Sequence, residues 1–240
     1  MDRIDARAYD MLRPVKFTPG FAEFAEGSVL IECGRTKVLC CASVEERTPP
    51  HVPEGEGWVT AEYSMLPRAN RERSRRDVAK LKLSPRSAEI QRLVGRSLRA
   101  AVDLAKLGER TITIDCDVLQ GDGGTRTASV TGGYLALALA CRKLMQEGVL
   151  TQNPLKGYVA GVSAGIVENR AMLDLCYEED SRAMVDLNCV MNDCGELIEV
   201  QGTGEGRAFT VEEQQELVRL CAKGVEELIA LQKKVLSQMV

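Results

Sequence analysis

The spacing of hydrophobic residues changes along the chain from a two-residue period to a 3.6-residue period, and then does so again. Residues 28–44 form two β-rich runs with a Gly-containing turn between them, which predicts a hairpin. Residues 59–66 predict a further strand, and residues 111–119 alternate apolar and polar positions as a half-buried strand does. Helices are predicted over residues 89–107 and about 127–146, where apolar residues gather on a helical face.

The second half of the chain begins again with strands. Two hairpins are predicted, from residues 160–167 with 171–177 and from residues 185–191 with 196–201. A long amphipathic helix follows, and Thr210 and Glu213 form a capping box at its start. Hairpins followed by helices, twice, predict an α+β fold with helices packed on sheet faces. Because no linker divides the chain, a single domain over residues 1–240 is expected.

Charge is unevenly distributed. The 240 residues include 31 Lys and Arg against 35 Asp and Glu, a formal net charge of −4. Residues 68–99 hold eleven basic and three acidic residues, whereas residues 174–199 hold eight acidic residues and one basic residue. Residues 67–85 lack hydrophobic periodicity and predict a long, arginine-rich loop. The basic strip fits a polyanionic partner or a solvated surface, and charge alone does not decide between them.

The chain contains one histidine, His51, within the Pro- and Gly-rich segment 48–57, which predicts a loop. This excludes two-histidine nucleases and leaves too few ligands for zinc sites of the HExxH or Cys/His type. Acid–base chemistry is therefore expected from carboxylates or metal-bound water. The nine cysteines contain no CxxC pair and are interpreted as reduced core residues. Neither a secretory signal nor a membrane span is predicted, so a cytoplasmic location is expected.

A glycine-rich segment, Gly121-Asp122-Gly123-Gly124-Thr125-Arg126, lies between a predicted strand and a predicted helix. Glycines let backbone N–H groups converge, and the helix N-terminus adds a positive field. Thr125 adds a hydroxyl donor, and Arg126 adds a guanidinium whose fork matches phosphate oxygens. The segment therefore predicts an anion site, with a tight strand-to-helix connection as the alternative. Arg86, near the start of the preceding helix, is a second candidate anion ligand, with a solvated arginine as the alternative.

The acidic group Glu178-Glu179-Asp180 is predicted to end one strand, and Asp186 to begin the next. A return of six residues brings Asp180 and Asp186 to one edge of the sheet. Paired carboxylates bind Mg²⁺ or Mn²⁺, and one of them can donate a proton. The alternative is a solvated acidic turn.

Motifs along nearly the whole chain carry a resemblance to a known family. They lie at residues 12–15, 26–28, 57–63, 89–93, 95–100, 115–120, 122–129, 179–181 and 199–203, together with Asp186. Through them the chain resembles the bacterial ribonuclease PH family. The resemblance implies the ribonuclease PH fold (ribosomal protein S5 domain 2-like), in which two βα halves pack helices on mixed sheets.

The resemblance also implies an activity: a phosphate-dependent 3′-to-5′ exoribonuclease, or tRNA nucleotidyltransferase, that trims the 3′ ends of tRNA precursors. Inorganic phosphate, the co-substrate, attacks the last linkage and releases a nucleoside diphosphate, and the reaction can run in reverse. The family assembles as a hexamer, a trimer of dimers. Its members act on RNA 3′ ends with Mg²⁺ or Mn²⁺, so this cofactor and a homo-oligomer are expected here.

Each family role transfers to matching positions of this chain. The phosphate ligands match Arg86, Gly124, Thr125 and Arg126. The catalytic acidic pair, which also holds the divalent cation, matches Asp180 and Asp186. The RNA-binding arginines are expected at Arg68, Arg71, Arg73, Arg75, Arg76, Arg92 and Arg96. Base-specific reading is not expected, because few aromatic residues accompany these arginines in the sequence.

The chain departs from the family pattern at two places. Leu83-Ser84-Pro85 stands where the family often has glycines before its first phosphate arginine, and Asp5-Ala6-Arg7 replaces a frequent Asp-Gly-Arg. Three other functions stay open from the sequence alone. A small-molecule phosphotransferase with a glycine loop is one, although it leaves the arginine-rich strip unexplained. A non-catalytic RNA-binding ring subunit of the same fold would lack part of the acidic pair or of the phosphate arginines. A hydrolytic two-metal nuclease would not need two anion-binding elements.

Overall fold

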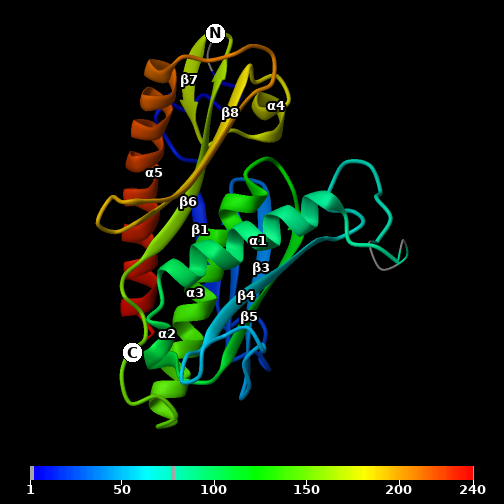
Figure 1. The fold of residues 1–240 in the computed structure, drawn as a ribbon. Helices are drawn as coiled ribbons and strands as arrows, with labels where there is room; N and C mark the ends of the chain where they lie inside the picture. Colours follow the sequence, from blue (N-terminus) through cyan, green and yellow to red (C-terminus); the bar gives the residue numbers. More distant parts are fainter. Residues whose placement is uncertain (1–2, 77–78, 80, 240) are drawn as a thin grey trace.

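The computed structural model describes residues 3–76, 79 and 81–239, which form two β-sheets and five helices (Figure 1). The first sheet has the order β1-β2-β3-β5-β4, with β1 at Val15–Pro19, β2 at Gly27–Cys33, β3 at Thr36–Glu45, β4 at Trp58–Met65 and β5 at Thr111–Gln120. The second sheet has the order β7-β6-β8-β9, with β6 at Val159–Val167, β7 at Arg170–Leu173, β8 at Val185–Asn192 and β9 at Leu197–Gly204. The helices are α1 (Pro85–Ala100), α2 (Leu104–Leu107), α3 (Thr125–Gln146), α4 (Tyr177–Asp180) and α5 (Val211–Ser237).

The two sheets differ in strand direction. In the first sheet β4 runs parallel to β5 and the other pairs are antiparallel, so that sheet is mixed as expected. The second sheet is antiparallel throughout its four strands. The alternation in β5 is confirmed: Ile112, Ile114 and Val118 have no exposed surface, whereas Asp115 and Asp117 on the opposite face are half-buried.

Helix α3 lies at the centre of the molecule, which explains why its sequence is apolar almost all round. It packs on β2 and β3 of the first sheet and on β6 of the second. Glycines permit the close approach, since a Cβ on Gly132 would come within 2.7 Å of Ile31. Helix α5 runs along β6 on the outer side of the second sheet (Figure 1), and Gln232 on α5 donates to backbone oxygens of both α3 and β6.

The predicted helix over residues 89–107 is longer at its start and interrupted near its end. Helix α1 begins at Pro85, because Ser84 accepts a hydrogen bond from the Ser87 N–H and proline is suited to the first turn. These residues stand in for the glycines of the family pattern and make a capped helix start. Helix α1 ends at Ala100, and Asp103 caps the separate helix α2.

The predicted strand over residues 171–177 is wrong beyond Leu173. Strand β7 ends there, and the acidic group Glu178-Glu179-Asp180 belongs to the one-turn helix α4. Asp174 leaves the strand in the left-handed region at φ 53°, and the Glu179 carboxylate accepts a hydrogen bond from the Cys176 N–H. These local bonds replace the strand pairing that the sequence pattern suggested.

The final helix matches its sequence signal. Thr210 and Glu213 form the reciprocal capping box, and the apolar stripe through Leu217, Cys221 and Leu228 is buried against the second sheet. Within the part of the chain that the structure describes, no helix is long and apolar enough to cross a lipid bilayer.

Candidate active site

Four segments far apart in sequence meet at one place: the start of α1, the glycine loop before α3, helix α4 and the start of β8. A Cβ on Gly123 would lie 2.9 Å from the Tyr177 backbone nitrogen at the start of α4, and Arg126 in the first turn of α3 lies 3.3 Å from Glu89 on α1. Loss of hydration raises the pKa values of Asp180 and Asp186. The positive charges of Arg86 and Arg126 oppose the rise at Asp180, and the negative charge of Asp180 adds to the rise at Asp186. The structure therefore brings together both predicted phosphate arginines and both predicted carboxylates.

The glycine loop has the backbone geometry that the sequence suggested. Gly123 and Gly124 are both in the left-handed region, at φ 79° and 65°, where other residues are strained. A Cβ on Gly123 would lie 2.5 Å from the carbonyl oxygen of Leu175, just before α4. The first turn of α3, residues 125–128, carries no acidic side chain. Its N–H groups and the helix dipole therefore face the site without a built-in counter-charge.

Buried bonds hold this loop from behind. The Arg13 guanidinium donates to the carbonyl oxygen of Asp122 at 2.6 Å, and the Thr36 hydroxyl donates to that of Gly123 at 2.7 Å. The Asp122 N–H in turn donates to the Thr36 hydroxyl at 2.9 Å. Arg35 adds an ion pair with the Asp122 carboxylate from the exposed side. The loop is thus fixed by side chains of β3 and of the segment before β1.

A second set of buried bonds links the same N-terminal segment to the acidic side of the site. The Asp174 carboxylate binds both Nε and Nη2 of Arg13, at 3.0 and 2.7 Å, and also accepts the Arg13 N–H at 2.7 Å. Arg3 makes a two-pronged ion pair with Glu179, the neighbour of Asp180 on α4. Arg13 is 4% exposed and Asp174 6% exposed, so the pair is buried. Burial alone would raise the pKa of Asp174, but Arg13 holds it below its ordinary value.

The Thr125 hydroxyl contacts the first sheet. It lies 2.8 Å from the Tyr63 hydroxyl on β4, and the residue is only 6% exposed. The side chain therefore anchors the start of α3 to the first sheet. The backbone N–H of Thr125, in the uncapped first turn of α3, is the group placed to meet an anion.

Arg126 reaches across the site to α1 and to β9. Its Nη1 donates to the side-chain oxygen of Gln201 on β9 at 2.7 Å and lies 3.3 Å from the Glu89 carboxylate on α1. The Gln201 amide also donates to Glu89, so the three side chains form a small network. The Arg126 side chain remains 20% exposed. It is held in place and still open to a solvent-borne anion.

The carboxylates are poised at the opposite side. Asp186 is half-buried and accepts a hydrogen bond from the Asn188 amide at 3.0 Å. Burial, and then the negative charge of Asp180, raise the pKa of Asp186 to about 6. Asp180 is the last residue of α4 and is exposed. Partial loss of hydration of its carboxylate raises its pKa, and the charges of Arg86 and Arg126 act against that rise. Two carboxylates with raised pKa values beside two arginines are typical of a catalytic centre.

The donor set fits a hard divalent cation. Mg²⁺ and Mn²⁺ are commonly held by one or two carboxylates, with water and substrate phosphate completing the shell. Asp180 and Asp186 provide two such carboxylates, and their mutual repulsion is what a cation would relieve. In the described part of the chain, no group of three or more His, Cys, Asp or Glu side chains forms a closed metal cage. The open pair matches a cation shared with a phosphate substrate.

The remaining predicted RNA-binding arginines lie outside this centre. Arg68, Arg71, Arg73, Arg75 and Arg76 are exposed in the loop that precedes α1, and this loop protrudes from the body of the molecule (Figure 1). Arg92 and Arg96 are exposed on α1, where Arg96 is paired with Glu199 of β9 at 2.8 Å. Asp77 and Lys80, which were counted in the basic strip, lie outside the described residues.

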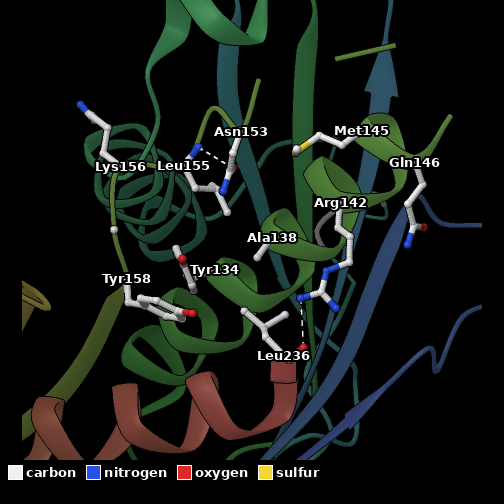
Figure 2. A pocket seen from close by; sticks show the side chains of 11 residues that line it. Tyr134, Ala138, Arg142, Met145, Gln146, Asn153, Leu155, Lys156, Tyr158 and Leu236 are labelled. Atoms are coloured by element: carbon white, nitrogen blue, oxygen red, sulfur yellow. Dashed lines mark hydrogen bonds between the residues drawn. The ribbon is translucent and has the colours of Figure 1, made fainter. Parts of the chain in front are cut away.

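A large cavity elsewhere contains none of the predicted site residues. Figure 2 shows it between α3, the segment leading to β6 and the end of α5, with a volume of about 610 Å³. Tyr134 and Tyr158 lie on one side of it, with ring centres 5.5 Å apart. The Arg142 guanidinium donates to the carbonyl oxygens of Leu236 and Met239, so it caps the end of α5. This cavity is apart from the charged centre.

Several functional neighbours were not singled out from the sequence. Glu89 and Gln201 lay within the quoted motifs without an assigned role, and so did Arg13. For Asn188 and Asp174 the sequence gives weaker indications of a role near the site. A polar residue inside a strand pattern, such as Asn188 two positions after Asp186, was the available clue, since alternate strand residues share a face.

Both halves of the chain match one family of known proteins. Residues 11–143 match the model of the 3′ exoribonuclease family, domain 1, and residues 157–224 match that of domain 2 of the same family. The ribonuclease PH of Bacillus pumilus is 53% identical over 240 residues, covering 99% of each chain. That of Syntrophomonas wolfei is 52% identical over 237 residues, covering 98% of this chain and 99% of the relative.

Solved structures share the fold at lower identity. Rice Rrp46 superposes with a TM-score of 0.79 at 17% identity, covering 98% of this chain and 100% of that one. An Archaeoglobus fulgidus exosome with RNA bound to the active site gives a TM-score of 0.79 at 24% identity, covering 95% and 91%. The ribonuclease PH fold is thereby established. With family models matching both halves and relatives above 50% identity over nearly its full length, the chain belongs to the 3′ exoribonuclease family, among the ribonucleases PH.

Proposed function

We propose that the chain is a phosphate-dependent 3′-to-5′ exoribonuclease that trims tRNA precursors and other RNA 3′ ends. The observation that carries the proposal is the junction of Arg86, Arg126 and the open start of α3 with the carboxylates Asp180 and Asp186. One side of the site suits an anion, and the other suits a proton donor and a cation. Phosphorolysis needs both sides at once.

In the proposed reaction, an oxygen of inorganic phosphate attacks the phosphorus that joins the last two nucleotides. The bond between that phosphorus and the 3′ oxygen of the penultimate nucleotide breaks, and this oxygen takes up a proton. The products are a nucleoside diphosphate and an RNA shortened by one nucleotide. Two anions must approach closely, and the guanidinium groups and the helix N-terminus lower the repulsion between them.

The acidic pair serves two tasks, carrying a proton and holding a divalent cation. A pKa of about 6 lets Asp186 carry a proton near neutral pH, which suits a group that protonates a leaving oxygen. The same pair fits Mg²⁺ or Mn²⁺, which when bound would neutralise charge on the phosphates. With a single histidine in the chain, at His51 in a loop, carboxylates are the available acids.

Exposed arginines supply the proposed RNA contacts. The protruding loop carries five of them, which suits electrostatic binding to the backbone of a folded tRNA. A hexamer built as a trimer of dimers is part of the proposal and is supported by the resemblance to ring-forming relatives. A cytoplasmic location is also included, because all nine cysteines are free thiols, which is typical of a reducing compartment.

Product analysis tests the proposal directly. An RNA whose last linkage carries ³²P is incubated with Mg²⁺, with and without inorganic phosphate. A labelled nucleoside diphosphate that forms only with phosphate is the expected result. Labelled monophosphate formed without phosphate would instead identify a hydrolase. RNA binding without any product would identify a non-catalytic ring subunit.

A further inference from the structure

A groove runs beside α1, and none of the proposed catalytic residues lines it. It lies between α1 and the start of β4, has a volume of about 460 Å³, and is lined by His51, Trp58, Arg92, Arg96 and Arg99 among others. We call it the α1 groove. Its arginines are spaced i, i+4 and i+7, so they form one stripe along the helix. None of the described residues that line the groove is acidic.

The groove contains both the only tryptophan and the only histidine of the chain. The two rings are packed edge to face, with centres 5.0 Å apart at an angle of 89°. The Arg99 guanidinium lies 4.2 Å from the centre of the Trp58 ring and donates to the Val59 carbonyl oxygen at 2.7 Å. An ordered, partly exposed aromatic and cationic platform results, although the sequence separates His51 from the arginines by more than forty positions.

The charges of the groove are only partly balanced. Arg96 pairs with Glu199 on β9 at 2.8 Å. Arg99 has no acidic partner in the described part of the chain, and burial together with the like charge of Arg96 lowers its pKa. Arg92 is exposed on the same stripe. An anion placed between these guanidinium groups would remove repulsion that the protein itself leaves in place.

The position of the groove relates it to the catalytic centre. Arg86 stands at the first turn of α1, and Arg96 follows ten residues later, which is about 15 Å along the helix axis. A strand of RNA whose 3′ end lies between Arg86 and Asp180 could thus continue along α1 toward Trp58. Arginines beside an aromatic ring are what proteins use to hold single-stranded nucleic acid, through phosphate contacts and base stacking.

We propose that the α1 groove binds the single-stranded segment of RNA upstream of the terminal nucleotide, with a base stacked at the Trp58 platform and its phosphates at Arg92 and Arg99. This rests on the proposed function and extends it, because it assigns a base contact to a protein whose sequence suggested backbone contacts alone. Every base has an aromatic face, so the contact tolerates any sequence and suits a trimming enzyme.

The single tryptophan makes a direct measurement possible. The full-length protein is titrated with a 12-nucleotide oligoadenylate in phosphate-free buffer with Mg²⁺, and Trp58 fluorescence is recorded. Saturable quenching is expected. An abasic oligomer of the same length and charge is expected to quench severalfold less, because it offers phosphates without bases. Equal quenching by the two oligomers would overturn the proposed stacking.

Two variants separate the ring from the fold. Binding of a 5′-fluorescein-labelled oligoadenylate is followed by anisotropy in Trp58→Leu and in Trp58→Phe. Trp58→Leu is expected to raise the Kd about tenfold, and Trp58→Phe to stay within about twofold of the wild type, since phenylalanine keeps an aromatic face. Phe24→Leu, which removes an exposed aromatic ring outside the groove, is the matched control and leaves the Kd unchanged. Thermal unfolding confirms that each variant is folded.

Other outcomes assign the groove differently. Equal Kd values for all four proteins overturn the proposal. A change in the mass of the oligomer for Trp58→Leu, with RNA affinity unchanged, assigns the groove to contacts between copies of the chain. The proposed function is tested separately with the wild type. If the wild type releases no diphosphate from a trinucleotide in the presence of phosphate, the proposed function is wrong. Phe24→Leu is expected to release diphosphate from that trinucleotide at the wild-type rate, because Phe24 lies outside the groove.

Discussion

The glycine loop before α3 and the arginine-rich loop before α1 are the two regions proposed to bind phosphate and RNA, and they are built in opposite ways. The glycine loop is held by buried side chains, with Arg13 and Asp174 each less than 10% exposed. The arginine-rich loop exposes Arg68, Arg71, Arg73, Arg75 and Arg76 to solvent. One region is fixed before a ligand arrives, and the other presents charge on a surface.

Under the proposed function, the difference follows from what each region would recognise. A phosphate that must be aligned with a phosphodiester needs donors whose positions are set in advance, because misplacement costs rate. A folded RNA body offers many phosphates, and contact with several of them needs charge more than fixed geometry. Variants should therefore affect the two regions in different observables: rate and phosphate dependence at the glycine loop, and RNA affinity with its salt dependence at the arginine-rich loop.

The largest effect is expected at the acid facing the glycine loop. Asp186→Asn should lower turnover by about a thousandfold, because it removes a proton carrier and a cation ligand together. The free energy of unfolding, by contrast, should increase in this variant. The folded protein raises the pKa of Asp186 from 3.8 to about 6, so it binds the proton more tightly than the unfolded chain does. Stability is therefore lost as pH rises from about 4 to about 6, and stays lower above that range.

The same variant thus separates catalysis from folding. At pH 8 without divalent cation, Asp186→Asn should be more stable than the wild type by up to about 3 kcal/mol. Urea unfolding at pH 4 and pH 8 measures this, with the difference between the two proteins disappearing at pH 4. Mg²⁺ should stabilise the wild type and leave the variant unaffected. A variant less stable than the wild type at pH 8 would show that Asp186 serves the fold.

The second largest effect is expected at Arg126. Arg126→Ala should lower turnover about a hundredfold at saturating phosphate and raise the KM for phosphate, because a donor aimed at the attacking anion is lost. RNA binding in phosphate-free buffer should survive, since the protruding loop is untouched. Phosphate titrations at fixed RNA provide the measurement, with Arg126→Lys as the variant that keeps the charge but not the fork. Activity equal to the wild type at low phosphate would remove Arg126 from the phosphate site.

Much of this site could be predicted from the sequence, and the reasons differ by residue. The glycine loop can be predicted from local sequence, because two glycines between a strand and a helix permit the left-handed backbone seen at Gly123 and Gly124. The sequence predicts Asp180 as a site residue but places it at the end of a strand, whereas it lies in helix α4. The pattern showed a β-rich run and could not show that Asp174 leaves the strand to bind Arg13, 161 positions earlier in the chain.

Contacts across the fold account for the rest. The contact of the Thr125 hydroxyl with Tyr63 on β4, at 2.8 Å, could not be predicted, because residues so far apart in sequence meet only in the folded chain. The contact between Trp58 and Arg99 could not be predicted for a similar reason, because few aromatic residues lie near the arginines in the sequence. The parallel pairing of β4 with β5 and the packing of α1 on β4 bring His51 and Trp58 to Arg99.

The buried support of the glycine loop offers the next test of the comparison. Arg13→Lys keeps a positive charge but cannot bind Asp174 and the Asp122 carbonyl oxygen together. A loss of about 3 kcal/mol in unfolding free energy is expected, with a roughly tenfold higher KM for phosphate. Arg35→Lys is the matched control, because Arg35 contacts the same loop from the exposed side, where an ion pair contributes less than about 1 kcal/mol. Lower stability with an unchanged KM for phosphate would limit Arg13 to the fold.

The smallest effect is expected at the exposed loop. Arg73→Glu with Arg76→Glu should weaken binding of a whole tRNA precursor by roughly tenfold at low salt, and should reduce the salt dependence of that affinity. A short single-stranded oligonucleotide should bind as before, because it does not reach the protruding loop. Arg219→Glu with Lys234→Glu makes the same change of charge at exposed positions on α5 and serves as the control. Equal loss on both RNAs would mean that the loop acts on the catalytic centre or on assembly, and that the division between a fixed and a surface region is wrong.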